Sequence, residues 1–251
     1  MEIKSNFFSF ITVSHGHFDD ICELIRSIDT FWKGKCELVI IDNKNEDIFN
    51  LDYLQSLCKS NFLSIKLIKQ YKFRSFSANN NLGVVNATYD NLFIINPDIK
   101  FYNKEVFDKY SSIKISSVYY PKLLNADFSI QEHYNAWPNF IGQLLRLFRY
   151  KLGLKNKNKN KNMGWFFAAA IILSKHDFFA IDGFNEHYSL YCEDVDFYHK
   201  LKCKNINVIY DDDISLIHNL GGESKGKYLL KAISSNIKWR FFRVWNYLYY
   251  R

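Results

Sequence analysis

Proline and glycine are scarce, with 3 and 10 residues in a chain of 251. This scarcity argues against a linker-rich protein. No CxxC pair occurs, and the number of cysteines is odd, so neither a disulfide framework nor a zinc site is expected, and a reducing cytoplasm is the simpler setting. The longest uncharged apolar stretch, around Trp165 to Leu173, is too short to span a bilayer. The five cysteines are Cys22, Cys36, Cys58, Cys192 and Cys203.

What is present is a large apolar fraction and an excess of positive charge. Hydrophobic residues make up 48% of the chain, enough for a substantial core, and the length suits one large α/β domain or one domain with a small appendage. The formal charge of +7 leaves three partner classes open: nucleic acid, anionic lipid and phosphorylated small molecules.

The first half of the chain alternates between short apolar runs and amphipathic stretches. Helical stripes, such as that in 19–30, separate the runs. This alternation predicts βαβ units around a mostly parallel sheet, with ligands outside the carboxyl ends of the strands. The expected strands are Phe7 to Val13, Glu37 to Ile41, Leu63 to Ile68 and Leu92 to Ile95.

The second half is less regular. We expect strands over 116–124 and 163–173 and a helix over 193–202. Residues 139–152 form an amphipathic segment, and the Lys-Asn repeat over 155–162 is typical of a mobile loop. The pattern over residues 225–251 predicts a basic helix rich in aromatic residues. Such a helix could bind an anionic bilayer surface or pack on the domain.

Two carboxylates fall where predicted strands end. Asp98 follows Asn96 and Pro97, and a carboxylate at this position could bind a hard cation such as Mg²⁺ or Mn²⁺. The same tripeptide is also typical of an ordinary turn after a strand, in which the aspartate has no catalytic role. Asp42 ends the second strand and could accept a hydrogen bond from a pyrimidine base or simply cap a turn. Arg74 could meet a diphosphate or stay a surface charge.

A second acidic group opens the predicted helix at 193. Glu193, Asp194 and Asp196 lie within four residues, so one carboxylate can cap the helix while a neighbour faces a cleft as a general base. His218 follows a short strand over 214–217 and could bind a divalent metal or be a bystander.

Taken together, six strings resemble family 2 glycosyltransferases of the GT-A fold, and most closely bacterial O-antigen and cell-wall rhamnosyltransferases. They occur in the family's order and spacing and span most of the chain. The strings are ITVSHGHFDDI (11–21), IIDN (40–43), SFSANNNLG (75–83), LFIINPDI (92–99), GFNEHYSLYCEDVDF (183–197) and IHNLGGES (217–224).

The resemblance implies a GT-A domain over 1–224, with a nucleotide-sugar half (1–100) and an acceptor half (101–224), followed by the helix of 225–251. It implies an inverting, metal-dependent transferase whose base is Asp194, or alternatively Glu193. Asp98 and His218 would hold Mg²⁺ or Mn²⁺. Residues expected to bind the donor are Val13, Ser14, Asp42, Arg74, Asn80, Asn96 and Asp98, and those expected on the acceptor side are Trp165, Ala168 and Glu193.

Two departures from the family pattern concern the substrates. The chain has Ser75 where many members have a glycine before the asparagine run, which bears on the backbone near the diphosphate. The segment Phe166 to Ala170 is bulkier than the Gly-Ala of many members, which leaves the acceptor's identity open.

The expected partners are a dTDP- or UDP-sugar donor and a glycan or polyprenyl-linked sugar acceptor, with dTDP-rhamnose as the first choice of donor. UDP-hexose and UDP-N-acetylhexosamine are alternatives.

Three other classes of protein compete with this prediction. A sugar-nucleotide pyrophosphorylase would need a glycine-rich phosphate loop after the first strand, and this loop is missing. A non-catalytic homologue is the second class, and a nucleic-acid-binding module, which the acidic strand ends disfavour, is the third. We therefore expect a cytoplasmic enzyme at the inner face of the membrane that does not bind nucleic acid.

Overall fold

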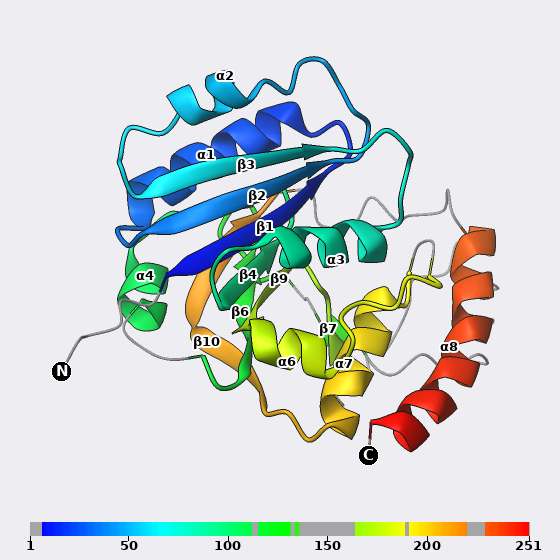
Figure 1. Cartoon of the computed structure of the whole chain (residues 1–251). Coiled ribbons are helices and arrows are strands. Elements are labelled where there is room, and N and C mark those ends of the chain that lie inside the picture. The colour runs from blue at the N-terminus through cyan, green and yellow to red at the C-terminus, as the bar shows by residue number, and fades with distance from the viewer. Residues whose placement is uncertain are drawn as a thin grey trace.

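The computed structural model describes residues 7–111, 115–131, 134–135, 164–188, 191–219 and 229–250. Helices and strands alternate through the first hundred residues, and the helices flank one large sheet that the strands form (Figure 1). The helices are α1 (Phe18–Phe31), α2 (Leu51–Ser56), α3 (Phe76–Asn86), α4 (Glu105–Tyr110), α6 (Lys175–Ala180), α7 (Glu193–Cys203) and α8 (Leu229–Tyr249). The strands of the large sheet are β1 (Phe8–Ser14), β2 (Cys36–Asp42), β3 (Leu63–Lys69), β4 (Asn91–Ile95), β5 (Ile99–Lys100), β6 (Val118–Leu124), β9 (Ala170–Ser174) and β10 (Val208–His218).

The order of strands in this sheet is β3-β2-β1-β4-β9-β6-β10-β5. The pairs β1–β2, β1–β4, β2–β3 and β6–β10 are parallel, whereas β9 runs antiparallel to β4 and β6. Ser14, Asp42 and Lys69 are in register, so the first three strands end at one level. The prediction of an α/β fold with a mostly parallel sheet is confirmed.

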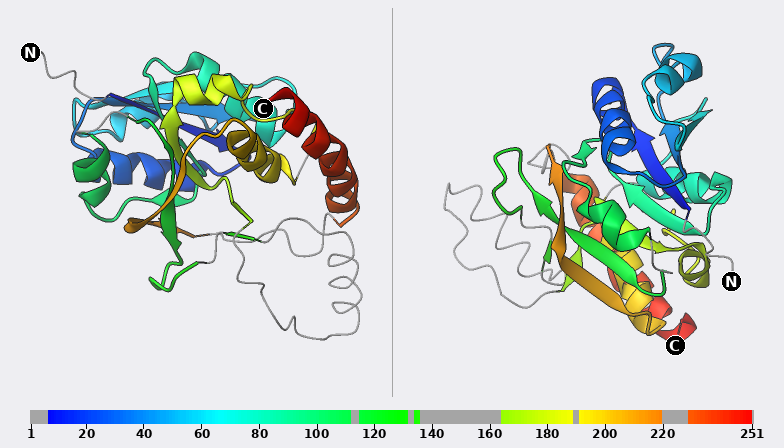
Figure 2. Two further views of the ribbon diagram at one scale, coloured as in Figure 1. Left: turned by 90° about the horizontal axis from the view of Figure 1, so that it is seen from below. Right: turned by 90° about the vertical axis from the view of Figure 1, so that its left-hand side faces the viewer.

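Both faces of the sheet are buried because successive strand residues point to opposite sides. Phe10 and Ile40 pack with α1 in one core, while Ile11 and Ile41 pack with α3 and α7 in another. A β-carbon at Gly83 of α3 would lie 2.4 Å from Ile11 Cγ2, so glycine allows the helix to approach β1 closely. Figure 2 shows helices on both sides of the sheet. Burial of both faces explains why these strands are continuous apolar runs.

The expected continuous strand over 163–173 is wrong. Its described part breaks at a turn around Ala168 and Ala169. The strand before the turn, β8 (Trp165–Phe166), pairs with β7 (Tyr134–Asn135) in a separate two-stranded sheet, and β9 follows it in the large sheet. An apolar run carries no signal for such a break, because contacts from other segments hold the turn, as shown below.

The sequence reading also missed α4, α6 and the short strand β5, and it began β10 six residues too late. The segments predicted at 139–152 and 155–162, and the boundary at 224–225, lie outside the described residues. All five cysteines are free thiols. Within the described ranges, no helix combines the length and apolar character needed to cross a membrane.

Candidate active site

Asp98 and His218 meet at the edge of the sheet. Asn96, Pro97 and Asp98 form a turn after β4, closed by a hydrogen bond from Ile99 N to Asn96 O at 3.3 Å. Proline suits the second position of such a turn because its φ is fixed. Immediately after it, Ile99 of β5 pairs with His218 of β10. This pairing brings Asp98 Oδ2 to 3.3 Å from His218 Nε2, although 120 residues separate them.

The orientation of the His218 ring is fixed from its far side. Gln131 Oε1 lies 2.6 Å from His218 Nδ1, and Gln131 Nε2 donates to Asn125 Oδ1 at 3.1 Å. Because an amide oxygen only accepts, Nδ1 carries the proton. In the neutral ring Nε2 then keeps its lone pair, which faces Asp98 and lies 3.3 Å from Asn96 Nδ2.

Glu193 and Asp194 form a second acidic centre at the start of α7. Burial raises the pKa of Glu193 to about 7. Burial first, and then the charge of Glu193, raise the pKa of Asp194 well above its usual value. Glu193 Oε2 is buried and has no hydrogen-bond partner within the described ranges. A carboxyl group whose pKa lies near neutrality is suited to proton transfer.

Backbone strain precedes this pair. Tyr191 and Cys192 have φ values of 67° and 70°, in the left-handed region that side chains of their size rarely adopt. Cys192 is buried against Val195, Trp165 and Trp239. This packing holds the chain in a conformation that directs two successive carboxylates inward, and such strain is concentrated at functional sites.

Hydrogen bonds through the turn after β8 connect the two acidic centres. The Ala168 N–H donates to the Asp194 carboxylate. The next residue, Ala169, accepts a hydrogen bond from Asn96 N at 2.9 Å. A path of contacts therefore leads from Asp98 and His218 through Asn96 and the turn at Ala168 and Ala169 to Asp194.

The ends of β1, β2 and β3 form a third group of polar contacts. Both oxygens of the buried Asp42 accept backbone N–H groups, from Lys44 at 3.1 Å and Glu46 at 2.8 Å. Asn43 accepts from Arg74 N at 3.0 Å and donates to Arg74 O at 2.9 Å. The exposed Arg74 is thus anchored by its backbone beside Asp42.

Other predicted residues have mainly structural partners. Ser14 is buried at the end of β1, where its Oγ accepts from His17 N at 3.1 Å, and Val13 packs partly buried beside it. Asn80 is buried and donates within α3 to Phe76 O at 3.0 Å. Trp165 packs with the residues that open α7. Ser75, at the position where many family members have glycine, caps α3 by accepting from Ala78 N at 3.2 Å.

The Asp98–His218 pair has the chemistry of a divalent metal site. It offers a carboxylate oxygen and an imidazole nitrogen, and the other ring N–H is held by a hydrogen bond, as it almost always is in a metal-binding histidine. The described residues contain no group of three His, Cys, Asp or Glu side chains that could hold an ion. Mg²⁺ is commonly held by one or two carboxylates together with substrate phosphates, so two protein ligands fit this class.

Comparisons with known proteins bear on the fold and the kind of enzyme. No protein-family profile matches the chain. The rhamnosyltransferase WbbL of Escherichia coli K12 is 22% identical over 249 residues, which cover 92% of this chain and 90% of the relative. The chain has the GT-A fold, and its similarity to this relative over most of its length supports a glycosyltransferase.

Solved structures show the same fold at low identity. Residues 1–349 of S. aureus TarS match this glycosyltransferase with a TM-score of 0.59 and 16% identity, over 84% of this chain and 60% of that one. GalNAc-T7, crystallised with UDP, GalNAc and Mn²⁺, matches with a TM-score of 0.65 and 11% identity, over 97% of this chain and 50% of that one. The mannosyltransferase PcManGT of Pyrobaculum calidifontis, in complex with GDP-Man and Mn²⁺, matches with a TM-score of 0.60 and 12% identity, over 92% of this chain and 64% of that one. The glycosyltransferase thus spans half to two thirds of these chains.

Three site features escaped the sequence reading. Gln131 orients His218 but lies outside the six strings, and Asn43 anchors Arg74 but was given no role, although it belongs to the string 40–43. The left-handed pair Tyr191 and Cys192 also gave no signal, because neither is glycine or asparagine.

Proposed function

We propose that this glycosyltransferase moves a sugar from a nucleotide-diphosphate donor to a hydroxyl of a glycan or polyprenyl-diphosphate-linked sugar, with inversion at the anomeric carbon. One observation carries the proposal: a metal-type pair, Asp98 and His218, lies at the carboxyl edge of the sheet, connected by hydrogen bonds to the partly buried carboxylate pair Glu193 and Asp194. The pairing of a cation site with a proton acceptor is what transfer from a diphosphate requires.

The nucleotide would lie across the ends of β1 to β3. Asp42 shapes this end because its carboxylate holds the backbone of the following loop. The contact of Asp42 with the base or ribose remains our assignment, as do those of Val13, Ser14 and Asn80. Arg74 would place its guanidinium toward the diphosphate, since its backbone is clamped by Asn43.

The acceptor would enter beside the turn at Ala168. Asp194 takes the proton of the acceptor hydroxyl, and the oxygen forms its bond to the anomeric carbon while the bond from that carbon to the diphosphate oxygen breaks. Asp194 is preferred to Glu193 as the base because its carboxylate contacts Ala168, whose neighbour Ala169 bonds to Asn96 of the metal-type site. Trp165 would support the acceptor side through its packing on α7.

Mg²⁺ or Mn²⁺ held by Asp98 and His218 would neutralise the negative charge that develops on the leaving diphosphate. Gln131 keeps the His218 lone pair directed toward Asp98, and Asn96 lies within hydrogen-bonding distance of the same nitrogen. These residues prepare the site before the donor binds.

Rhamnose from dTDP-rhamnose is our first choice of donor because the relative similar over most of its length is a rhamnosyltransferase. The reaction would then serve O-antigen or other cell-surface polysaccharide synthesis on the cytoplasmic side of the membrane. A UDP-hexose or UDP-N-acetylhexosamine is the alternative. A screen of nucleotide sugars for Mn²⁺-dependent release of nucleoside diphosphate separates these donors, and no release from any of them would contradict the proposal.

Asp194→Asn gives the sharper test. It keeps the shape of the side chain but removes the base, so we expect turnover to fall by about 10²–10⁴-fold while nucleotide binding persists. Asp52→Asn, which changes an exposed residue of α2, is the matched control and should leave both turnover and nucleotide binding unchanged. Near-normal turnover of Asp194→Asn would exclude it as the base, and the same measurement on Glu193→Gln tests the alternative.

A further inference from the structure

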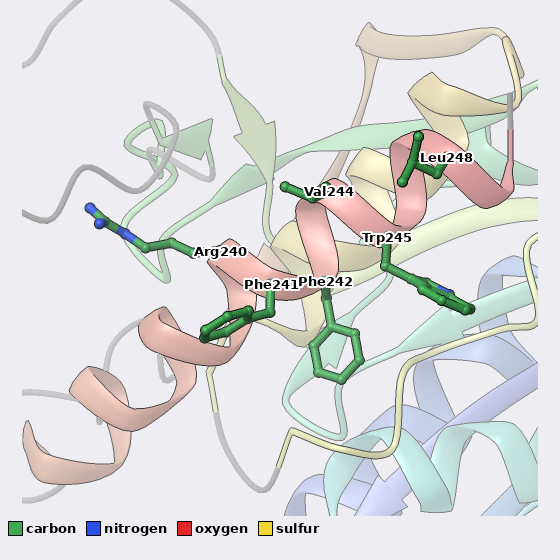
Figure 3. A pocket seen from close by; sticks show the side chains of 6 residues that line it. All are labelled: Arg240, Phe241, Phe242, Val244, Trp245 and Leu248. Atoms are coloured by element: carbon green, nitrogen blue, oxygen red, sulfur yellow. The ribbon is translucent and has the colours of Figure 1, made fainter.

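The two sides of α8 are chemically different. Its inner side is buried against the domain and contains Ser235, Trp239 and Asn246, and the buried Tyr250, directly after the helix, continues this stripe. Its outer side is apolar but exposed: Ile237 is 48% exposed, Phe241 74%, Val244 61%, Trp245 60% and Leu248 73%. Figure 3 shows the side chains of Phe241, Val244, Trp245 and Leu248 projecting from the helix. A continuous exposed stripe of this kind marks an interaction site.

Charge on α8 has one sign. The helix contains no Asp or Glu, and its sequence includes Lys231, Lys238, Arg240 and Arg243. At 3.6 residues per turn, Lys238 lies on one border of the apolar stripe and Arg240 on the other. The exposed Tyr247 and Tyr249 also lie on the two borders. Cations and tyrosines bordering an apolar stripe are the pattern of a helix that lies in the interfacial layer of an anionic bilayer.

The inner side fixes α8 to the helix that carries the carboxylate pair. Asn246 Nδ2 donates to Asp196 Oδ1 at 2.8 Å, between two buried side chains. The Trp239 ring meets His199 edge-on at 5.1 Å, and Tyr250 OH donates to Asp182 Oδ2 at 2.9 Å. The outer side therefore has a fixed orientation relative to α7, as a rigid membrane contact needs.

We propose that the outer side of α8, defined by Ile237, Phe241, Val244, Trp245 and Leu248, binds the surface of an anionic bilayer. The apolar side chains enter the boundary between headgroups and acyl chains, and Arg240, on the border of the stripe, pairs with lipid phosphates. If the acceptor is lipid-linked, as proposed above, this contact places the carboxylate pair beside the surface that carries it. The membrane contact itself does not depend on that acceptor.

The test is flotation of the full-length protein with vesicles of phosphatidylcholine alone or mixed with phosphatidylglycerol. The wild type should float with the anionic vesicles and lose binding as salt rises. The Phe241→Ser, Leu248→Ser double variant should bind about tenfold more weakly or worse. The Arg240→Gln variant should weaken the preference for anionic vesicles. The matched control is Phe62→Ser with Val85→Ser, which removes exposed apolar side chains elsewhere and should bind as the wild type does.

Equal thermal unfolding of the variants shows that they are folded. Wild-type affinity in the Phe241→Ser, Leu248→Ser variant, or no flotation of the wild type, would overturn the proposal. So would self-association of the wild type that this variant abolishes without any vesicle binding, because the stripe would then join two copies of the chain. Flotation needs no sugar transfer, so failure of the proposed reaction leaves this result intact.

Discussion

Replacing Gln131 by alanine tests the metal site without touching either proposed ligand. The Gln131 side chain accepts the Nδ1 proton of His218 at 2.6 Å and is itself held by Asn125. Without it, the imidazole can rotate or move its proton to Nε2, the nitrogen that faces Asp98. Either change removes the lone pair that a metal would use, so metal affinity should fall while nucleotide contacts at Asp42 persist.

The size of the effect follows from the burial of the ring. The His218 side chain is only 11% exposed, so water replaces the lost hydrogen bond incompletely. A hydrogen bond of this kind contributes about 1–2 kcal/mol, which corresponds to a loss of about 5- to 30-fold in Mn²⁺ affinity. The affinity for Mn²⁺ can be measured directly by titration followed by electron paramagnetic resonance. The nucleoside diphosphate selected by the donor screen should be present.

Two further variants separate orientation from general damage. Gln131→Glu keeps an oxygen acceptor for Nδ1 and should restore most of the affinity. Gln55→Ala removes a glutamine that joins α2 to β3, far from the site, and should leave Mn²⁺ binding unchanged. Mn²⁺ affinity within about twofold of wild type in Gln131→Ala, with a clear loss in Asp98→Asn, would refute the idea that Gln131 orients the histidine.

Two other predictions concern stability. Burial raises the pKa of Glu193 to about 7 from a usual value near 4.5, so its protonated form stabilises the metal-free fold below about pH 4.5, and this contribution is lost as pH rises through 7. Glu193→Gln should therefore raise the Tm of metal-free protein at pH 8 but not at pH 4, and an equal shift at both values would contradict the assignment. Asn246→Ala removes a donor from the buried Asp196, so it should lower stability by about 2 kcal/mol and the Tm by about 4–8 °C in a calorimetric scan. An unchanged Tm would show that this hydrogen bond does not hold α8 to α7.

Much of the first half of the chain was predictable from local pattern. The runs that became β1 to β4 are apolar throughout because both sides of each strand are buried, and the helix α1 shows its stripe because one side faces solvent. The carboxylates at strand ends were likewise visible, since a parallel sheet gathers such ends at one edge.

The sequence by itself determined which residues carry acid, base and ligand chemistry, and that strands and helices alternate, because both depend on residue type and short-range period. Only the tertiary structure decided that Asp98 faces His218, that Gln131 fixes its proton, and that the run around Ala168 turns instead of continuing. Those outcomes depend on strand pairing and hydrogen bonds between residues that lie from 26 to 120 positions apart, which no local pattern encodes.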